Sequence, residues 1–181
     1  MPTNRERAID AAIGLLAEGG PRALTHARVD AAAGLPKGST SNDFRSRSAL
    51  LAGVTDAIVQ REAAGVTTTL APASAAELVD ACCALLDLVT LEQRTVTAAR
   101  LALFLEAAHE PGLAEPLARG RAMLEATVRQ VLGGLGATDA AAGAAALMAC
   151  FEGLILHRIA RNGDGDARAT FATVVRGALP D

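Results

Sequence analysis

The segment with the most distinctive chemistry is a run of short polar side chains at residues 37–43, Lys-Gly-Ser-Thr-Ser-Asn-Asp. Hydroxyl and amide groups that follow a lysine can approach a DNA groove closely and bond phosphate oxygens and base edges there. Asn42 is the best base reader in the run, because its amide can pair with adenine through a donor and an acceptor together. A solvated loop has the same composition, so composition alone leaves both interpretations open.

Two helices are predicted ahead of this run. Apolar residues recur at helical spacing over residues 4–18, and the Gly-Gly-Pro sequence that follows is suited to end this first helix. Thr25 can cap a second helix over 26–33, and Gly34 can end it. The spacing therefore predicts two helices and a short turn directly before the polar residues.

The polar run itself is predicted to form a third helical segment over 36–44. Pro36 suits its first turn, because the N–H that proline lacks would have no partner there. Phe44 alone looks like an apolar anchor. A helix with so little apolar surface gains little from burial, so something other than burial must select it. Ser46 can cap a fourth helix over 47–65.

The rest of the chain predicts an all-helical body. Of the 181 residues 51% are hydrophobic, Tyr and Trp are absent, and alanine is abundant, which favours helices around an aliphatic core. Five further helices are predicted at 75–91, 93–109, 114–133, 139–162 and 167–178. Their breaks fall at Thr67–Thr69 with Pro72, at Leu91-Glu92, at Pro111-Gly112, at 133–138 and at Asn162-Gly163-Asp164-Gly165. The fold class is therefore all-α, with about nine helices.

Charge is distributed unevenly along the chain. The net charge is −3, yet residues 1–47 carry seven basic and five acidic side chains. A basic N-terminal part on an acidic body is the distribution expected of a DNA-binding protein, although it is a weak signal alone.

Other functional classes find little support. Three cysteines, Cys82, Cys83 and Cys150, indicate free thiols that pack in the interior, with redox sensing as the alternative. Nucleophile elbows, phosphate-binding glycine loops and metal-spaced histidines are missing, so no enzyme activity, metal or cofactor is expected. Residues 162–166 lack the ligand pattern of a calcium loop.

The chain is expected to be cytoplasmic. Its first residues do not lead from a basic region into an apolar run, which argues against a secretory signal peptide. The most apolar stretch, 140–160, includes Glu152, His157 and Arg158, so it suits a buried or interface helix better than a membrane span.

Landmarks in the first 51 residues follow one recognisable order. They are Ala8, Ile9, Asp10, Ala11 and Ala12, then Leu15, Leu16, Ala17, Glu18 and Gly20, then Thr25, Val29, Ala33, Gly34 and Leu35, then Lys37, Gly38 and Ser39, then Phe44, Ser46, Leu50 and Leu51. This order and spacing resemble the DNA-binding domain of the TetR/AcrR family of transcriptional regulators. The resemblance covers about a quarter of the chain.

The resemblance implies a helix-turn-helix DNA-binding domain at 1–47 and an effector-binding and dimerisation domain at 48–181, connected by the helix 47–65. Three positions depart from the family. Ser41 stands where an aromatic residue is usual, Asp43 where His or Tyr is frequent, and Asp30 where a small residue is usual. These departures concern DNA affinity and operator sequence rather than the fold.

The resemblance also implies that the second helix braces against the DNA backbone while segment 36–44 enters the major groove. The residues predicted to contact double-stranded DNA are Thr25, His26, Arg28, Lys37, Gly38, Ser39, Thr40, Ser41, Asn42, Arg45 and Arg47. Lys37 is expected at the helix start, near a phosphate. The alternative function is a helical interaction protein of the same fold that has lost specific DNA binding.

One helix-turn-helix makes few contacts, so a homodimer on a palindromic operator is expected. The predicted dimer residues on helix 139–162 are Leu147, Phe151, Leu154, Ile155 and Arg158. A mostly apolar effector pocket is expected within 75–133. Its candidate residues are Leu86, Arg100, Phe104, His109, Met123 and Thr127. A small-molecule effector would release the protein, a repressor by family expectation, from its operator.

Overall fold

The computed structural model describes residues 1–66, 72–161, 163 and 165–180, with residues 62–66 in backbone only. Nine α-helices lie in this part of the chain, and it contains no strand, which confirms the predicted all-α class. They are α1 (Asn4–Gly19), α2 (His26–Ala33), α3 (Ser39–Asp43), α4 (Arg47–Val66), α5 (Ala75–Asp87), α6 (Arg94–Ala107), α7 (Pro111–Gly134), α8 (Ala140–Ala160) and α9 (Ala167–Ala178). The predicted breaks at Thr67–Thr69, Asn162 and Asp164 lie outside the described residues.

The chain divides into two compact units. The first consists of Met1–Glu62 and Thr95–Gly120, and the second of Ala63–Arg94 and Arg121–Asp181. Both are therefore built from two separate stretches of the chain. The division at residue 47 remains a prediction about function.

The first unit has a largely aliphatic core that includes the buried Phe44, with the partly buried Phe104 packed against it. Buried side chains of α1, α2 and α4 pack with Ala99 and Leu103 of α6 and with Leu113 and Leu117 of α7. The α1 contribution is the predicted helical stripe, and Leu16 at its end is 1% exposed. Burial of this stripe, rather than intrinsic helix propensity, provides most of the stability of such short helices.

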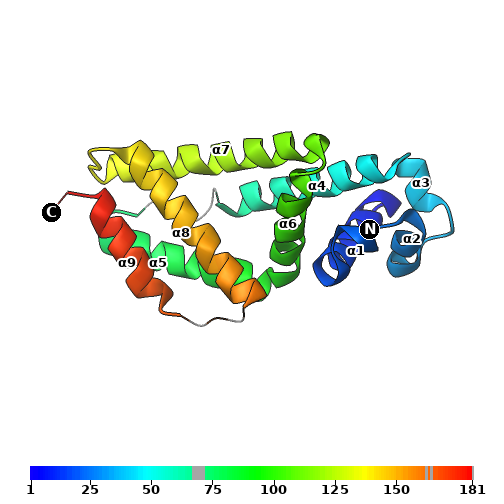
Figure 1. The fold of residues 1–181 in the computed structure, drawn as a ribbon, viewed down its shortest axis with the longest axis horizontal. Helices are drawn as coiled ribbons and strands as arrows, with labels where there is room; N and C mark the ends of the chain where they lie inside the picture. Colours follow the sequence, from blue (N-terminus) through cyan, green and yellow to red (C-terminus); the bar gives the residue numbers. More distant parts are fainter. Residues whose placement is uncertain (67–71, 162, 164, 181) are drawn as a thin grey trace. The chain divides into compact units, whose positions relative to one another are not determined.

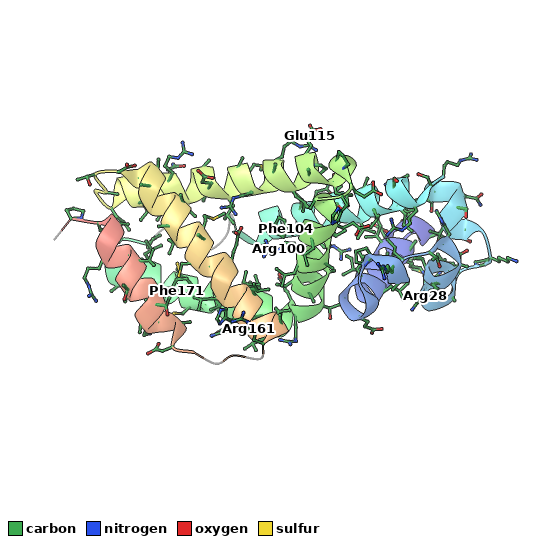
Figure 2. The ribbon with its side chains drawn as sticks, in the orientation of Figure 1. Arg28, Arg100, Phe104, Glu115, Arg161 and Phe171 are labelled. Atoms are coloured by element: carbon green, nitrogen blue, oxygen red, sulfur yellow. The ribbon has the colours of Figure 1, made fainter. Side chains whose placement is uncertain are left out.

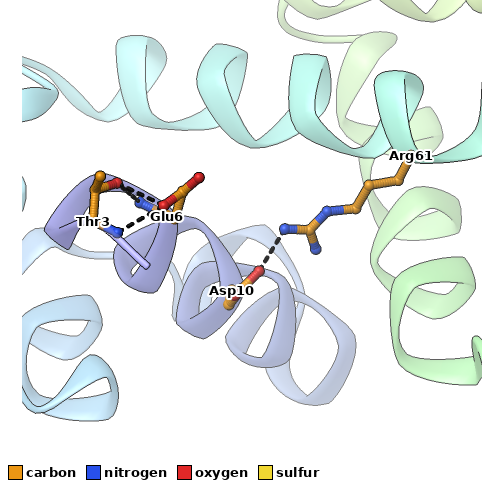
Figure 3. Close-up of polar contacts among 4 residues, drawn as sticks. All are labelled: Thr3, Glu6, Asp10 and Arg61. Atoms are coloured by element: carbon orange, nitrogen blue, oxygen red, sulfur yellow. Dashed lines mark hydrogen bonds and ion pairs between the residues drawn. The ribbon is translucent and has the colours of Figure 1, made fainter. Parts of the chain in front are cut away.

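Polar groups fix the start of α1 (Figure 3). The Thr3 hydroxyl accepts from the Glu6 amide at 3.2 Å, and the Glu6 carboxylate accepts from the Thr3 amide at 2.7 Å, which makes a reciprocal capping box. These bonds hold the pKa of Glu6 below its usual value. Further along α1, Asp10 pairs with Arg61 of α4 on the surface, where ion pairs contribute little stability.

The second unit packs α8 against α9, and α9 against α5 (Figure 1). Phe171 of α9 is fully buried, and its ring stacks on Phe151 of α8 with the centroids 5.8 Å apart. Figure 2 labels Phe171 among these helices. Three ion pairs join elements of this unit: Arg168 with Asp80, Arg121 with Glu152, and Arg158 with Asp87.

Among the helix boundaries that differ from the predictions, two in the later part of the chain reflect local backbone chemistry. The predicted helix 75–91 ends as α-helix at Asp87 and continues as a π-helical turn, Leu88–Glu92, in which the Thr90 hydroxyl donates to the Leu86 carbonyl at 2.6 Å. Helix α7 begins at Pro111, earlier than predicted, because proline is well suited to the first turn of a helix.

Helix α8 is long and apolar enough to cross a membrane by length and composition, with a mean hydropathy of 1.6 and 28% of that window buried. A core or interface helix of a soluble protein meets the same criteria. The low buried share shows that much of this apolar helix lies open at the surface of its unit.

Candidate functional site

Helix α2 is held at both ends. The Thr25 hydroxyl caps its start and accepts from the Arg28 amide at 3.3 Å. At its end Gly34 adopts the left-handed conformation (φ 61°), and Arg7 of α1 donates to the Ala33 carbonyl at 2.7 Å. These bonds satisfy backbone groups that a helix leaves unpaired at its ends. Arg28 is exposed on α2, where Figure 2 labels it.

The turn after α2 leads directly into the polar run. Gly38 has φ 90°, a conformation that side chains with a Cβ rarely adopt. The third helix therefore begins at Ser39 rather than at the predicted Pro36, and Lys37 lies in the turn before it. Within the predicted segment the helix has only five residues. Its N-cap residue is Gly38, which has no side chain to bond the free amides of the first turn.

The predicted DNA contacts divide by exposure. Thr25, Arg28, Lys37, Ser41, Asn42 and Arg45 are exposed, whereas His26, Gly38, Ser39 and Arg47 are half-buried and Thr40 is fully buried. The exposed set puts cationic, hydroxyl and amide groups on α2, on the turn and on α3. Such groups can bond phosphates and base edges.

Three predicted contacts are occupied by the protein itself. The Thr40 hydroxyl donates to Asp30 Oδ1 at 2.6 Å. His26 Nε2 lies 2.7 Å from the Phe44 carbonyl oxygen, a distance that requires the ring nitrogen to donate. Arg47 donates to the Pro21 carbonyl at 2.9 Å and pairs with Glu106 of α6 at 3.2 Å. These side chains therefore organise the first unit in this structure.

Asp30 is a buried carboxylate, 4% exposed, with bonds to Gly38 and Thr40 of segment 36–44. Its Oδ2 accepts from the Gly38 amide at 2.7 Å, and its Oδ1 accepts from the Thr40 amide at 2.8 Å as well as from the Thr40 hydroxyl. Burial alone would raise the pKa of Asp30, but these bonds and the charge of His26 outweigh it and hold the pKa below the usual value. The group is therefore an ionised acceptor at neutral pH.

Phe44 anchors the segment after α3. Its ring is 3% exposed, and the Arg5 guanidinium lies 4.5 Å from the ring centroid. A Cβ at Gly53 of α4 would lie only 2.4 Å from Phe44 Cε1, so the ring fits against bare backbone. The anchor predicted from sequence is confirmed as a buried side chain.

The second unit contains a small apolar pocket of about 40 Å³ between α5, α7 and α8. Its walls are Leu78, Cys82, Leu85, Leu124, Val128, Val131, Leu147, Met148 and Phe151. No side chain among them carries a charge. Burial, together with Cys83 and Cys150, raises the pKa of the Cys82 thiol to about 12, so this thiol stays protonated and behaves as a small apolar group.

The six predicted effector residues do not line this pocket. Leu86 is fully buried on α5, Met123 is 62% exposed on α7, and the half-buried Thr127 donates to the Met123 carbonyl. Arg100 lies over the Phe104 ring at 5.3 Å on α6, in the first unit, and His109 is exposed. The predicted set thus falls on both units and remains a prediction.

The predicted dimer residues lie on the inner face of α8. Leu147 and Ile155 are buried, Phe151 stacks on Phe171, Leu154 is half-buried, and Arg158 pairs with Asp87 and bonds the Thr90 hydroxyl. The opposite face is exposed at Ala142, Ala145, Ala146, Ala149 and Leu156. An open groove of about 400 Å³ lies along it, between Ala142 and Ala146 of α8 and Thr173 and Gly177 of α9.

The profile of the tetracyclin repressor-like C-terminal domain matches residues 73–181, more than half of the chain. The chain belongs to the TetR family of transcriptional regulators. The matched residues of this TetR protein begin after those that carry the sequence resemblance. Two separate parts of the chain therefore indicate the same family. A comparison with curated proteins finds no match.

Solved structures with the same fold extend over nearly the full length of this TetR protein. A transcriptional regulator from Rhodococcus sp. Rha1 is 22% identical with a TM-score of 0.85, over 97% of this chain and 96% of its own. A TetR-family member from Streptomyces coelicolor A3 is 25% identical with a TM-score of 0.77, over 99% and 100%. The multidrug binding protein EbrR, complexed with ethidium, is 23% identical with a TM-score of 0.75, over 99% and 100%.

Sequence reasoning missed three supporting residues of the first unit. Arg7 bonds the end of α2, Arg5 covers Phe44, and Asp30 bonds the start of α3. Asp30 carried a usable signal, because an acid in a short helix ahead of a glycine turn can accept the amides of that turn. Arg5 and Arg7 gave no such signal, since exposed arginines on a first helix have many possible partners.

Proposed function

We propose that this TetR protein is a cytoplasmic, dimeric regulator that binds a palindromic DNA operator and is released from it by a small apolar effector. In this proposal the protein acts by binding alone and catalyses no reaction. The observation that carries this proposal is the set of outward-facing groups around α3. Ser41 and Asn42 are exposed on α3, which we propose as the reading helix, and Lys37 and Arg28 flank it with positive charge. Repression rather than activation is what we expect for a member of this family.

DNA reading is tested by selecting duplexes from random-sequence DNA with the wild-type protein and titrating the recovered duplex. Asn42→Ala should lose about 1–3 kcal/mol on that duplex alone, because base contacts carry the sequence information. Lys37→Ala should weaken binding to every duplex about equally and reduce the salt slope by about 1, because a phosphate contact releases counterions.

Gln60→Ala is the matched control, because Gln60 is an exposed amide side chain on α4 and not on the reading helix. It should bind as wild type does. If wild type, Lys37→Ala and Asn42→Ala all bind every duplex equally weakly, the regulator proposal fails. The chain would then be a helical interaction protein that has lost specific DNA binding, with Asp43 exposed on α3 as the group that opposes phosphate.

The effector is proposed to be uncharged and apolar, because the pocket between α5, α7 and α8 has only apolar walls. A buried cation without a polar partner there would be costly. Its volume of about 40 Å³ is far below the roughly 300 Å³ or more of drug-sized sites, so the walls must move apart on binding. A ligand that favours the opened arrangement shifts the population of conformations, which supports release from DNA.

A thermal-unfolding assay with naphthalene, which is uncharged and apolar, and with ethidium, which is a cation, tests the proposed kind of effector. We expect naphthalene to raise the unfolding midpoint and ethidium to leave it unchanged. Val131→Phe, which fills the pocket, should abolish the naphthalene shift, whereas Leu105→Phe on the exposed side of α6 should preserve it. Stabilisation by ethidium alone would contradict the apolar-effector proposal.

A further inference from the structure

Helix α3 needs an external support. It has five residues, mostly with modest helix propensity, and one of them, Thr40, is buried. A helix this short is unstable unless tertiary contacts select it. Both α1 and α2 pack against α3, and the side-chain hydrogen bonds to it described here come from α2.

Two side chains of α2 hold the two ends of α3. Asp30 accepts from Gly38 and Thr40 at the start of α3, and His26 bonds the carbonyl of Phe44 just after its end. His26 and Asp30 are four residues apart, so they lie one above the other on a single face of α2. The two contacts therefore fix both the position of α3 and its rotation about its own axis.

The rotation decides which side chains face outward. Thr40 is fully buried because its hydroxyl and amide both bond Asp30. Successive helix residues are turned by about 100°, so Asn42 lies about 160° around the axis from Thr40. Pinning Thr40 against Asp30 consequently directs Asn42 away from the protein, and both Ser41 and Asn42 are exposed.

We propose that Asp30, supported by His26, is a positioning residue that determines how selectively α3 reads a base sequence rather than how tightly the protein holds DNA. This inference rests on the proposed DNA-binding function. It assigns His26 and Thr40, both predicted as DNA contacts, to the support of the reading helix. Exposed cations such as Lys37 and Arg28 lie outside this support, so they continue to attract DNA of any sequence.

The test compares two affinities for each variant of the full-length protein. One is for the duplex that wild type selects from random-sequence DNA, and the other is for a scrambled duplex of the same composition. Asp30→Asn should reduce the ratio of these affinities at least tenfold and change the affinity for scrambled DNA less than threefold. Partial unfolding would lower both affinities equally and leave the ratio unchanged, so the ratio reports positioning.

Three further variants separate the effect of positioning from the effect of charge. Thr40→Val deletes the hydroxyl bond to Asp30 without changing any charge, and it should lower the ratio, whereas Thr40→Ser keeps the hydroxyl and should retain it. Asp43→Asn makes the same charge change as Asp30→Asn at an exposed position with no bond to α2 among those described. It should strengthen binding to both duplexes alike and preserve the ratio.

Amide hydrogen exchange provides a readout that does not depend on DNA. In Asp30→Asn the amides of Gly38 and Thr40 should exchange at least tenfold faster than in wild type. If wild type discriminates between duplexes and Asp30→Asn and Thr40→Val discriminate equally well, the inference is overturned while the proposed function stands. If wild type does not discriminate at all, the proposed function fails and the inference fails with it.

Discussion

Phe44→Ala should lower the thermal unfolding midpoint by roughly 6–20 °C and abolish selective DNA binding. Truncating a buried phenylalanine costs about 3–5 kcal/mol, and each kcal/mol shifts the midpoint of a chain of this size by about 2–4 °C. Phe44 is 3% exposed, lies under the Arg5 guanidinium and follows directly after α3. Its loss therefore removes core packing and the anchor of the reading helix together.

Circular dichroism melts and titration of the selected duplex measure these two effects. Phe44→Leu is the matched control, because it keeps a large apolar side chain and should recover much of the midpoint. The variant Gly53→Ala offers an independent check of the same packing, because the added Cβ would lie 2.4 Å from Phe44 Cε1 and the ring would have to shift. A Phe44→Ala protein that melts and binds as wild type does would show that this ring is not the anchor.

Ala149→Arg should convert the proposed dimer into a monomer and weaken operator binding at least a hundredfold. Ala149 is exposed on the outer stripe of α8, where small side chains allow a second helix to approach closely. An arginine there adds bulk and a charge that an apolar interface leaves unpaired. A monomer reads one half-site, so the contacts of the second half-site are lost.

Sedimentation equilibrium at micromolar concentration measures the mass of wild type and variant. Ala126→Arg adds the same side chain at an exposed position of α7, and it should leave the dimer intact. A wild-type mass of one chain would exclude the dimer, and an Ala149→Arg dimer would place the interface elsewhere on the protein.

The helices with apolar stripes were predictable from the sequence. The α1 stripe, the Thr25 cap and the Gly34 end of α2 follow from spacing and local backbone chemistry, and the structure confirms each of them. Helix α9, predicted at 167–178, has the same bounds in the structure. These features depend on neighbours within a few residues, which a sequence shows directly.

Features that depend on distant partners were less accessible. Segment 36–44 is polar, and its support comes from Asp30 through bonds that span eight and ten residues. The inner and outer faces of α8 could not be told apart either, because both are apolar and only packing against α5 and α9 buries Leu147 and Ile155. Sequence showed that these segments mattered, and the structure shows what each side chain contacts.

The separate roles of α2 and α3 also bear on how a regulator of this kind could come to bind a new DNA sequence. Ser41 and Asn42 are exposed and make no side-chain bond among those described, whereas Asp30 and Thr40 carry the support. Exchanging the two outward residues would change the base contacts without disturbing the scaffold beneath. Under the proposed function, single substitutions at these two positions can therefore change operator preference and leave the bonds between α2 and α3 intact.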